Sequence, residues 1–296
     1  MFPAPRFFFR HKFLTRLARS VWKRYARTFK GPWFVERRMG ALWLFEQHNI
    51  IDRYLFCVGV WEEAQVARLT DLARKLGVDR GRPIFLDIGS HAGFYAVLMA
   101  KTGLFSEVVA CEPLPAHLAQ LQANLLLNDL VGAVTVHAAA ASDKAGTLRF
   151  AAGPPSNRGT AHALDSASTG LLSATPPDQI IEVDARRMDD LAPLRGGSAA
   201  IKIDVEGHEA LTLTGMRDFL AANRCVLQVE ILSDGLAHVS DLLRDIGYRP
   251  LGAIDFDHYF TNAPAIAAAT EATPEAAGDK FSGDRASGDR PSGDRR

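Results

Sequence analysis

The chain has 296 residues, of which 47% are hydrophobic and 23% are charged. This length suffices for one full α/β core with an appendage at each end, and excludes neither an enzyme nor a binding module. The 34 basic residues equal the 34 acidic ones in number, but residues 1–40 hold eleven Lys or Arg and the single acid Glu36, so the remainder is acidic.

Apolar runs and cysteines narrow the expected compartment. No run reaches the length of about 18 apolar residues that a transmembrane helix needs, and Phe7–Phe9 is too short an apolar core for a secretory signal. Cys57, Cys111 and Cys225 lie far apart without a Cys-x-x-Cys pair, which argues against a disulfide framework or a zinc site. We expect a cytoplasmic protein, with association at a membrane surface left open.

Residues 1–54 are predicted to form a basic, amphipathic, helical extension. Within it, residues 9–30 separate basic and apolar side chains onto opposite faces at helical periodicity. The basic face holds Lys12, Arg16, Arg19 and Lys23, and the apolar face holds Phe13, Leu14, Leu17, Val21, Trp22 and Tyr25. Such a helix can contact an anionic membrane or a partner, pack on its own domain, or serve as an organelle transit peptide.

Residues 55–262 are predicted as one α/β domain, because strand-like and helix-like segments alternate along them. The predicted strands are 84–88, 107–111, 133–138, 199–204 and 225–231, followed by a strand pair around 248–260. The predicted helices are 61–76, 93–102, 115–128, 208–222 and 235–246. This order implies a doubly wound, mainly parallel, seven-stranded sheet of the Rossmann-like type.

Two segments interrupt or follow this alternation. Residues 151–180 are rich in Gly, Pro, Ser and Thr and are either a lid or acceptor-binding segment or a tolerated surface insertion. The runs 147–150 and 180–183 beside them can pair as a hairpin. Residues 263–296 change from an Ala-rich sequence to three Ser-Gly-Asp-Arg copies, and this low-complexity tail is predicted to be disordered.

The stretch 85–96 is the most informative part of the chain. An apolar run ends at Asp87, passes through Gly89 and Gly93, and continues as a helix-forming segment, which predicts a strand, a tight turn and a helix start. The glycines let backbone approach a ligand where a Cβ would collide, and the helix start offers N–H groups to an anion. His91 occupies the middle glycine position of the dinucleotide pattern Gly-x-Gly-x-x-Gly, which argues against an NAD site.

The following strand ends at Glu112, about 20 residues past the turn, where an acid can hold two ribose hydroxyls. Together with the turn it resembles S-adenosylmethionine-dependent methyltransferases. Further segments narrow the resemblance to the FkbM family over roughly residues 55–255. These segments are Gly59–Glu62, Ala140–Gly146, Arg187–Leu191 and Ile201–Glu209, and the last, with its Lys-x-Asp-x-Glu-Gly-x-Glu run, is the most specific. The chain departs from the family at Ser90 and His91, where Ala-Asn is common.

The resemblance implies S-adenosylmethionine as methyl donor, and the hydroxyl of a sugar, glycan, lipid or natural product as acceptor. Asp87 can accept from the donor's ammonium, Glu112 from its ribose and Asp143 from its adenine. The predicted cofactor-binding residues are Asp87, Gly89, Ser90, His91, Gly93, Phe94, Glu112, Pro113, Ser142 and Asp143. The structural alternatives are a helix cap for Asp87, a turn for Asp143 and a solvated strand end for Glu112.

Acidic residues after the fourth strand are the catalytic candidates. A hydroxyl is a poor nucleophile and benefits from a base, so Asp204 and Glu206 are expected to orient or deprotonate the acceptor, with Lys202 shifting their pKa values. Lys202, Asp204 and Glu206 would face the same way on an ideal strand. His208 and Glu230 complete the catalytic candidates. The alternatives are a first-turn helix acid for Glu206, a structural ion pair of Lys202 with Asp204, and a solvated Glu230. No metal is predicted.

The sequence leaves three alternative functions open. A nucleic-acid methyltransferase recruited by the basic N-terminus is disfavoured, because no Asn/Asp-Pro-Pro-aromatic motif follows the fourth strand, and a nucleic-acid partner is not expected. A non-catalytic membrane-docking protein that retains the fold is a further alternative, as is an NAD-dependent oxidoreductase. The expected partners are a small-molecule or glycan acceptor and, through residues 9–30, a membrane surface or a protein.

Overall fold

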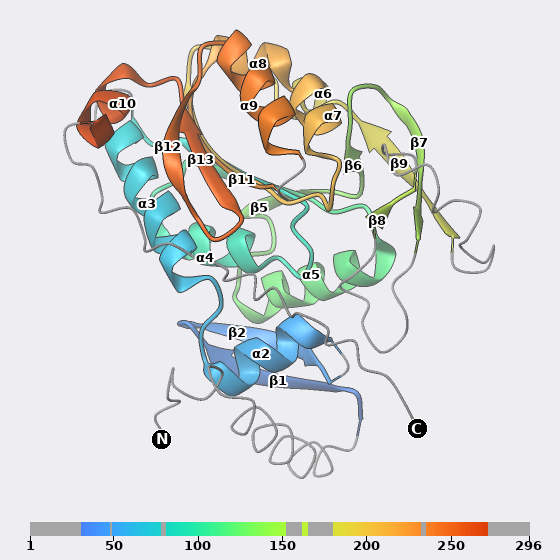
Figure 1. The fold of residues 1–296 in the computed structure, drawn as a ribbon. Helices are drawn as coiled ribbons and strands as arrows, with labels where there is room; N and C mark the ends of the chain where they lie inside the picture. The colour runs from blue at the N-terminus through green and yellow to red at the C-terminus, as the bar shows by residue number, and fades with distance from the viewer. Residues whose placement is uncertain are drawn as a thin grey trace, which may run out of the picture.

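The computed structural model describes residues 31–47, 49–77, 81–151, 162–164, 180–231 and 235–271. Figure 1 shows these segments as a central sheet with helices on both sides and a small hairpin layer beneath. The predicted helix 9–30, most of the insertion 151–180 and the Ser-Gly-Asp-Arg repeats lie outside the described residues. Within them, no helix is long and apolar enough to cross a membrane.

The central sheet has seven strands in the order β12-β13-β11-β10-β3-β4-β5. Their bounds are β3 Ile84–Ile88, β4 Glu107–Cys111, β5 Val134–His137, β10 Ser198–Ile203, β11 Arg224–Glu230, β12 Arg249–Ile254 and β13 Asp257–Thr261. Neighbouring strands are parallel except that β13 is antiparallel to β11 and β12. Every residue of β3 and β10 is buried, as expected for central parallel strands covered on both faces. The predicted doubly wound, mainly parallel sheet is confirmed.

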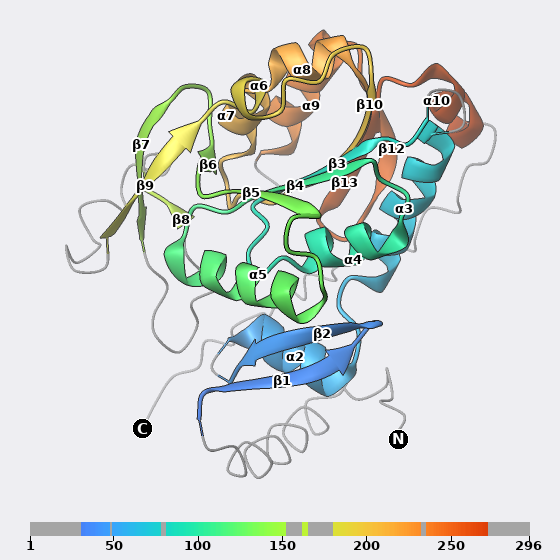
Figure 2. The same cartoon turned by 180° about the vertical axis from the view of Figure 1, so that it is seen from behind.

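Helices cover both faces of this sheet (Figures 1 and 2). One face packs against α3 Glu63–Gly77, α4 Phe94–Thr102 and α5 Pro115–Leu127, and the other against α6 Met188–Leu191, α7 Glu209–Thr214, α8 Arg217–Ala222 and α9 Leu236–Asp245. The alternation of side chains along a strand supplies both cores. Phe85 belongs to the first hydrophobic cluster, whereas Leu86 and Ile88 belong to the second.

The predicted helix 208–222 is divided into α7 and α8. The break falls at Gly215, where an added Cβ would lie 1.8 Å from the backbone oxygen of Ser142. A new helix starts after it because the Asp189 carboxylate accepts the N–H of Phe219 at 2.7 Å, which satisfies a first-turn donor that has no partner inside its helix. Asp189 belongs to the Arg187–Leu191 segment, so that segment has a structural role in this chain.

The predicted wholly helical extension 1–54 is wrong for residues 33–46. They form a hairpin of β1 Trp33–Arg38 and β2 Ala41–Glu46, followed by α2 Ile50–Val58. Met39 and Gly40 connect the strands with φ of 46° and 77°, the left-handed pair that a two-residue hairpin turn needs. The hairpin packs on α5, where the backbone N–H of Leu44 donates to Asn124 at 2.7 Å. The predicted domain boundary at residue 55 therefore falls inside α2.

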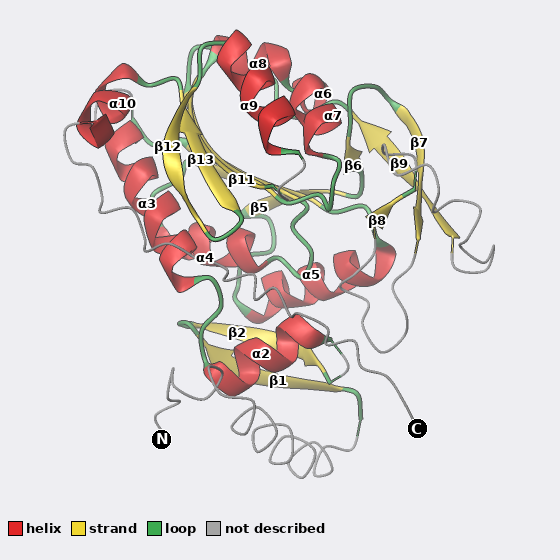
Figure 3. Cartoon of the chain, viewed as in Figure 1, coloured by secondary structure: helices red, strands yellow, loops and turns green. Residues whose placement is uncertain are grey.

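Two smaller features complete the fold, as Figure 3 shows. A four-stranded sheet has the order β6-β9-β7-β8, with bounds β6 Ala140–Ala141, β7 Gly146–Ala151, β8 His162–Ala163 and β9 Ile180–Arg186. The antiparallel β7–β9 pair confirms the predicted hairpin. The predicted disorder from residue 263 is wrong for residues 263–271, because α10 Pro264–Glu271 follows β13, and Ala263, Ile266 and Ala267 are buried. Burial of these apolar side chains stabilises the helix. The Ala-rich composition of the segment did not predict this burial.

Candidate active site

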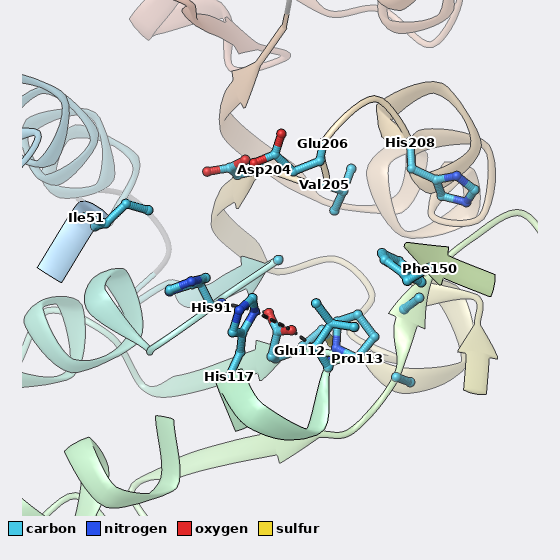
Figure 4. Close-up of a pocket in the computed structure, with 16 residues that line it drawn as sticks. Ile51, His91, Glu112, Pro113, His117, Phe150, Asp204, Val205, Glu206 and His208 are labelled. Carbon is cyan, nitrogen blue, oxygen red and sulfur yellow. Dashed lines mark hydrogen bonds and ion pairs between the residues drawn. The ribbon is translucent and has the colours of Figure 1, made fainter. Parts of the chain in front are cut away.

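A groove lies at the carboxyl ends of β3, β4 and β10, where open α/β sheets bind ligands. Its free volume is about 720 Å³, and we call it the strand-end groove. Figure 4 shows Asp204 and Glu206 on one side of it, and Glu112, Pro113 and His117 on the other. Of the predicted cofactor-binding residues, Gly89, His91, Glu112 and Pro113 line this groove. Of the predicted catalytic residues, Asp204, Glu206 and His208 do so.

The two glycines of the turn make room for the protein itself. Gly89 has φ of +80°, and an added Cβ would lie 1.7 Å from the backbone oxygen of Asp204. Gly93 also has φ of +80°, and its Cβ would lie 2.2 Å from Leu121 Cδ1. Both residues therefore need a conformation and a closeness that only glycine allows. At Gly89, which borders the groove, the close neighbour is the β10 end, so the fold itself already requires this glycine. That a ligand also needs the missing Cβ stays a prediction.

Glu112 is fixed from three directions at the end of β4. Its Oε2 accepts the backbone N–H of His91 at 2.8 Å, and its Oε1 accepts that of Leu114 at 2.9 Å. Nδ1 of His117 lies 3.4 Å from Oε1. The carboxylate is 3% exposed, so it is held ready inside the groove wall rather than solvated. His117 was missed by sequence reasoning, although its place in the first turn of α5, five residues after Glu112, was a usable signal.

His91 presents an unsatisfied nitrogen at the groove. Its Nε2 is buried and has no hydrogen-bond partner among the described residues. Burial, with His117 beside it, lowers the pKa of His91 to about 3, so the imidazole is neutral at physiological pH. The two imidazole rings are 4.0 Å apart between centroids. A buried polar atom without a partner is costly, and a ligand in the groove could satisfy it.

The other predicted cofactor-binding residues make contacts with the protein itself. Asp87 Oδ2 accepts the N–H of Ala96 at 2.8 Å, which makes it a cap for α4, and burial raises its pKa to about 7. Ser90 donates to the Cys111 carbonyl oxygen at 3.2 Å. Phe94 stacks on Trp43 of the hairpin with 5.4 Å between ring centroids. None of Asp87, Ser90, Gly93 and Phe94 lines the groove.

Ser142 and Asp143 follow the groove-lining Ala140 and Ala141 but do not line the groove themselves. The Ser142 hydroxyl is 3.0 Å from Nε2 of His208 and 3.1 Å from Asp143 Oδ1. The structure therefore brings His208 to Ser142, on the side of the groove next to Phe150 (Figure 4). This contact gives His208 a bridging role between β6 and α7.

Lys202 lies on β10, two residues before Asp204, and is 2% exposed. Its Nζ is 3.0 Å from Asp257 Oδ1 and 3.5 Å from Asp204 Oδ2. Although burial disfavours its charge, the surrounding carboxylates of Asp204, Glu62 and Asp257 raise the pKa of Lys202, so the ammonium is retained. The predicted pairing of Lys202 with Asp204 is present. Asp257, which sequence reasoning missed, is the closer partner.

A hydrogen-bonded chain extends from Lys202 toward α3. Gln228 Nε2 donates to Asp257 Oδ1 and to the Tyr95 hydroxyl, both at 2.8 Å, and Tyr95 donates to Glu62 Oε2 at 2.8 Å. These residues come from β11, β13, α4 and the start of α3. Only Glu62 had a sequence signal, as part of the Gly59–Glu62 segment.

Asp204 and Glu230 form a carboxyl pair at the ends of β10 and β11. Although burial raises the pKa of Asp204, the charge of Lys202 and then a hydrogen bond with Glu230 lower it, and the net shift is downward. Burial and the neighbouring Asp204 raise the pKa of Glu230 to about 9. At neutral pH the pair therefore shares one proton and carries one negative charge.

Glu206 lies beyond the strand, as the predicted bounds 199–204 imply, so its expected alignment with Lys202 and Asp204 on an ideal strand does not apply. Strand β10 ends at Ile203, and Glu206 adopts φ of 52° in the turn before α7. Although Glu206 as a whole residue is open to solvent, its side chain lies along the groove, where its carboxyl group is partly desolvated. Burial, together with Asp204 and Glu209 nearby, raises the pKa of Glu206 to about 7.

A second, wider cavity lies beside the groove, with a free volume of about 1640 Å³. Glu230 lines this second cavity, whereas its partner Asp204 lines the strand-end groove. Helix α2 contributes to both, through Ile51 to the groove and through Tyr54 to the cavity. The carboxyl pair thus stands where the two spaces adjoin.

Backbone strain is concentrated around these two spaces. Six non-glycine residues in the described segments have a left-handed φ. Four of them line the groove or the second cavity: Glu62, His91, Glu206 and Asp255. Such conformations cost about 1–3 kcal/mol each and cluster at functional sites. In the described part of the chain, no three His, Cys, Asp or Glu side chains gather closely enough to hold a metal ion.

The chain is similar to solved methyltransferase structures. One is a methyltransferase FkbM from Methylobacillus flagellatus KT, at 18% identity and TM-score 0.40, covering 60% of this chain and 43% of that one. Another is a SAM-dependent methyltransferase from Agrobacterium tumefaciens, at 12% identity and TM-score 0.44, covering 79% and 70%. A third is M. jannaschii TYW2 in complex with AdoMet, at 11% identity and TM-score 0.39, covering 79% and 85%.

The chain spans less than half of the length of the M. flagellatus protein, and no curated protein matches it. The family model of the methyltransferase FkbM domain matches residues 87–250, from the end of β3 to β12. This range is more than half of the chain and contains both the glycine turn and the Lys202–Glu209 run. The chain therefore belongs to the FkbM methyltransferase family.

Proposed function

We propose that this protein transfers a methyl group from S-adenosylmethionine to a hydroxyl of a sugar, glycan, lipid or other small-molecule acceptor. The observation that carries the proposal is the carboxyl pair at the junction of two spaces. Asp204 borders the strand-end groove and Glu230 borders the second cavity. Two substrates, one in each space, would meet at a charged group able to orient a hydroxyl.

The residues of the groove fit S-adenosylmethionine. Glu112 is a fixed carboxylate. Each oxygen accepts one backbone N–H and His117 Nδ1 lies 3.4 Å from Oε1, so Oε2 has a lone pair left for a ribose hydroxyl. His91 Nε2 is a buried polar atom in need of a partner. Ala140 and Ala141 leave room for a flat base beside Phe150. When bound, the sulfonium supplies an electrophilic methyl group, and its transfer to oxygen leaves S-adenosylhomocysteine.

The chain's own carboxyl groups handle the acceptor. Asp204 is ionised beside Lys202 and can accept the hydrogen bond of the acceptor hydroxyl, which aims an oxygen lone pair at the groove. As the methyl group is transferred, the single hydroxyl proton passes to Asp204, and Glu206, which lies near Asp204 and has a pKa of about 7, can take it up at neutral pH. Lys202 is a positioning residue, because it is buried and lines neither space.

Ligand titration followed by methyl transfer tests this proposal. Isothermal titration should detect S-adenosylhomocysteine binding and no NAD binding. Incubation with S-adenosylmethionine labelled in the methyl group should then transfer label to hydroxyl compounds of a glycan and lipid extract, and not to RNA. Binding of NAD alone would indicate an oxidoreductase. Label in RNA would indicate a nucleic-acid methyltransferase.

Glu112→Gln should weaken S-adenosylhomocysteine binding by about 5-fold to 100-fold, because one acceptor oxygen of a buried, hydrogen-bonded carboxylate is lost. Glu107→Gln is the matched control, since Glu107 stands exposed at the other end of the same strand and should bind as the wild type does. Equal affinities of the two variants for S-adenosylhomocysteine, measured by calorimetry, would show that Glu112 does not bind the ribose.

The pH dependence of methyl transfer should report Glu206. Its raised pKa leaves it protonated below about 7, so kcat/KM should fall as pH drops through this value and level off above it. Glu206→Gln should lower kcat/KM by about 10-fold to 100-fold and abolish this limb. Asp87 has a pKa near the same value, so S-adenosylhomocysteine affinity over the same pH range is the control. A limb that persists in Glu206→Gln would assign the proton to another group.

A further inference from the structure

The lining of the second cavity is acidic and aromatic. Its acidic residues are Glu62, Glu63, Glu230, Asp255 and Asp257, and its aromatic residues are Tyr54, Trp61 and Phe256. Among the residues that the structure describes, no Lys, Arg or His belongs to this lining. The cavity opens to solvent over exposed aromatic surface, since Tyr54 is 36% and Phe256 is 57% exposed.

Only some of these carboxyl groups contribute an uncompensated negative charge to the cavity. Asp257 is compensated by Lys202 at 3.0 Å. Glu230 shares a proton with Asp204, and burial with that neighbour raises its pKa to about 9. Burial raises the pKa of Glu62, whereas the charge of Lys202 and the hydrogen bond from the Tyr95 hydroxyl lower it. Asp255 is an exposed carboxyl group whose hydrogen-bond donor, the Gln65 amide at 3.5 Å, is neutral. The cavity therefore has a negative potential.

This potential discriminates between acceptors by charge. A carboxylate or phosphate in the cavity would lie beside Glu62 and Asp255, and no described lining residue is a cation that could pair with it, which is unfavourable in a partly desolvated site. An ammonium group would gain charge-assisted hydrogen bonds from the same carboxylates. Tyr54 and Trp61 pack edge to face, with ring centroids 5.4 Å apart, and an uncovered ring face of this pair attracts a cation.

We propose that the second cavity binds the acceptor and selects one that carries an ammonium group beside its hydroxyls, such as an amino sugar. This inference rests on the proposed methyl transfer and specifies its acceptor. The hydroxyl lies at Glu230 and Asp204, and the ammonium lies among Glu62, Asp255 and the aromatic rings.

Saturation-transfer difference NMR can test this with the full-length protein saturated with S-adenosylhomocysteine. The probes are glucosamine, N-acetylglucosamine and glucuronate, which present an ammonium, no charge and a carboxylate on a hexose ring. Glucosamine should bind at least about tenfold more tightly than the other two, and 0.5 M NaCl should weaken it several-fold by screening. Equal binding of the three hexoses, tighter glucuronate, or no glucosamine binding would overturn the inference.

Asp255→Asn supplies the site-specific test. It should reduce glucosamine affinity by about 3-fold to 10-fold while leaving N-acetylglucosamine and S-adenosylhomocysteine affinity unchanged. Asp129→Asn is a matched control, because Asp129 is also an exposed aspartate with a left-handed φ, 57° against 55°, and lines neither space. Equal effects of the two variants would contradict the proposal.

The outcomes also separate this inference from the proposed function. Methyl transfer to a neutral or anionic hydroxyl compound, with normal S-adenosylhomocysteine binding, would refute the ammonium selectivity and leave the methyltransferase proposal intact. If the wild-type protein does not bind S-adenosylhomocysteine, both the methyltransferase proposal and the ammonium selectivity are refuted.

Discussion

Asp204→Asn should lower kcat/KM for methyl transfer by about 100-fold, because the charged acceptor of the hydroxyl hydrogen bond is lost and the oxygen is no longer held in line. The side chain keeps its size, and Lys202 keeps its closer contact with Asp257 at 3.0 Å. Steady-state rates with labelled S-adenosylmethionine would measure the change. A value within threefold of the wild type would remove Asp204 from the reacting centre.

Two controls separate a lost catalytic contact from a damaged fold. S-adenosylhomocysteine affinity should stay within about threefold of the wild type, because the donor contacts assigned to Glu112 and His91 are untouched. Asp190→Asn, at an exposed position of α6, should leave both kcat/KM and thermal stability unchanged. Parallel loss of stability in Asp204→Asn alone would assign the residue a structural role.

Gly89→Ala should reduce the free energy of unfolding by about 3 kcal/mol or more, from a left-handed conformation and a steric clash together. The clash is with backbone, since the new Cβ would lie 1.7 Å from the Asp204 carbonyl oxygen, and two adjacent strand ends would have to separate. Urea unfolding would measure the loss, and the surviving folded fraction should bind S-adenosylhomocysteine poorly.

Two other glycines measure the cost of the left-handed conformation and the cost of the steric clash separately. Gly40→Ala has the left-handed conformation, with φ of +77°, but no atom within 4 Å of the new Cβ, and should cost about 1 kcal/mol. Gly215→Ala has an ordinary φ of −76° but a Cβ 1.8 Å from the Ser142 oxygen, and should cost about 1–3 kcal/mol. A loss in Gly89→Ala no larger than that in Gly40→Ala would contradict the close strand contact.

The predicted elements were most accurate where local signals coincide. Strands 84–88 and 107–111 have the predicted bounds, because short apolar runs there end at a glycine turn or at Glu112. The hairpin 33–46 was missed because its apolar residues alternate weakly and its Met39–Gly40 turn is not one of the strong turn pairs such as Asn-Gly. The helix 264–271 was hidden by composition, since its stability comes from packing on the rest of the fold.

The amino-acid sequence by itself determined the sheet, its ligand-binding edge and the family, because strand periodicity, glycine turns and acids at strand ends are local patterns. It also identified Asp204, Glu206, Glu112 and His91, which do line one groove. Only the tertiary structure decided that Lys202 pairs with Asp257, that Asp204 pairs with Glu230, and that Gly89 accommodates the β10 end. These contacts join residues distant in sequence, and burial and charge there depend on which strands become neighbours.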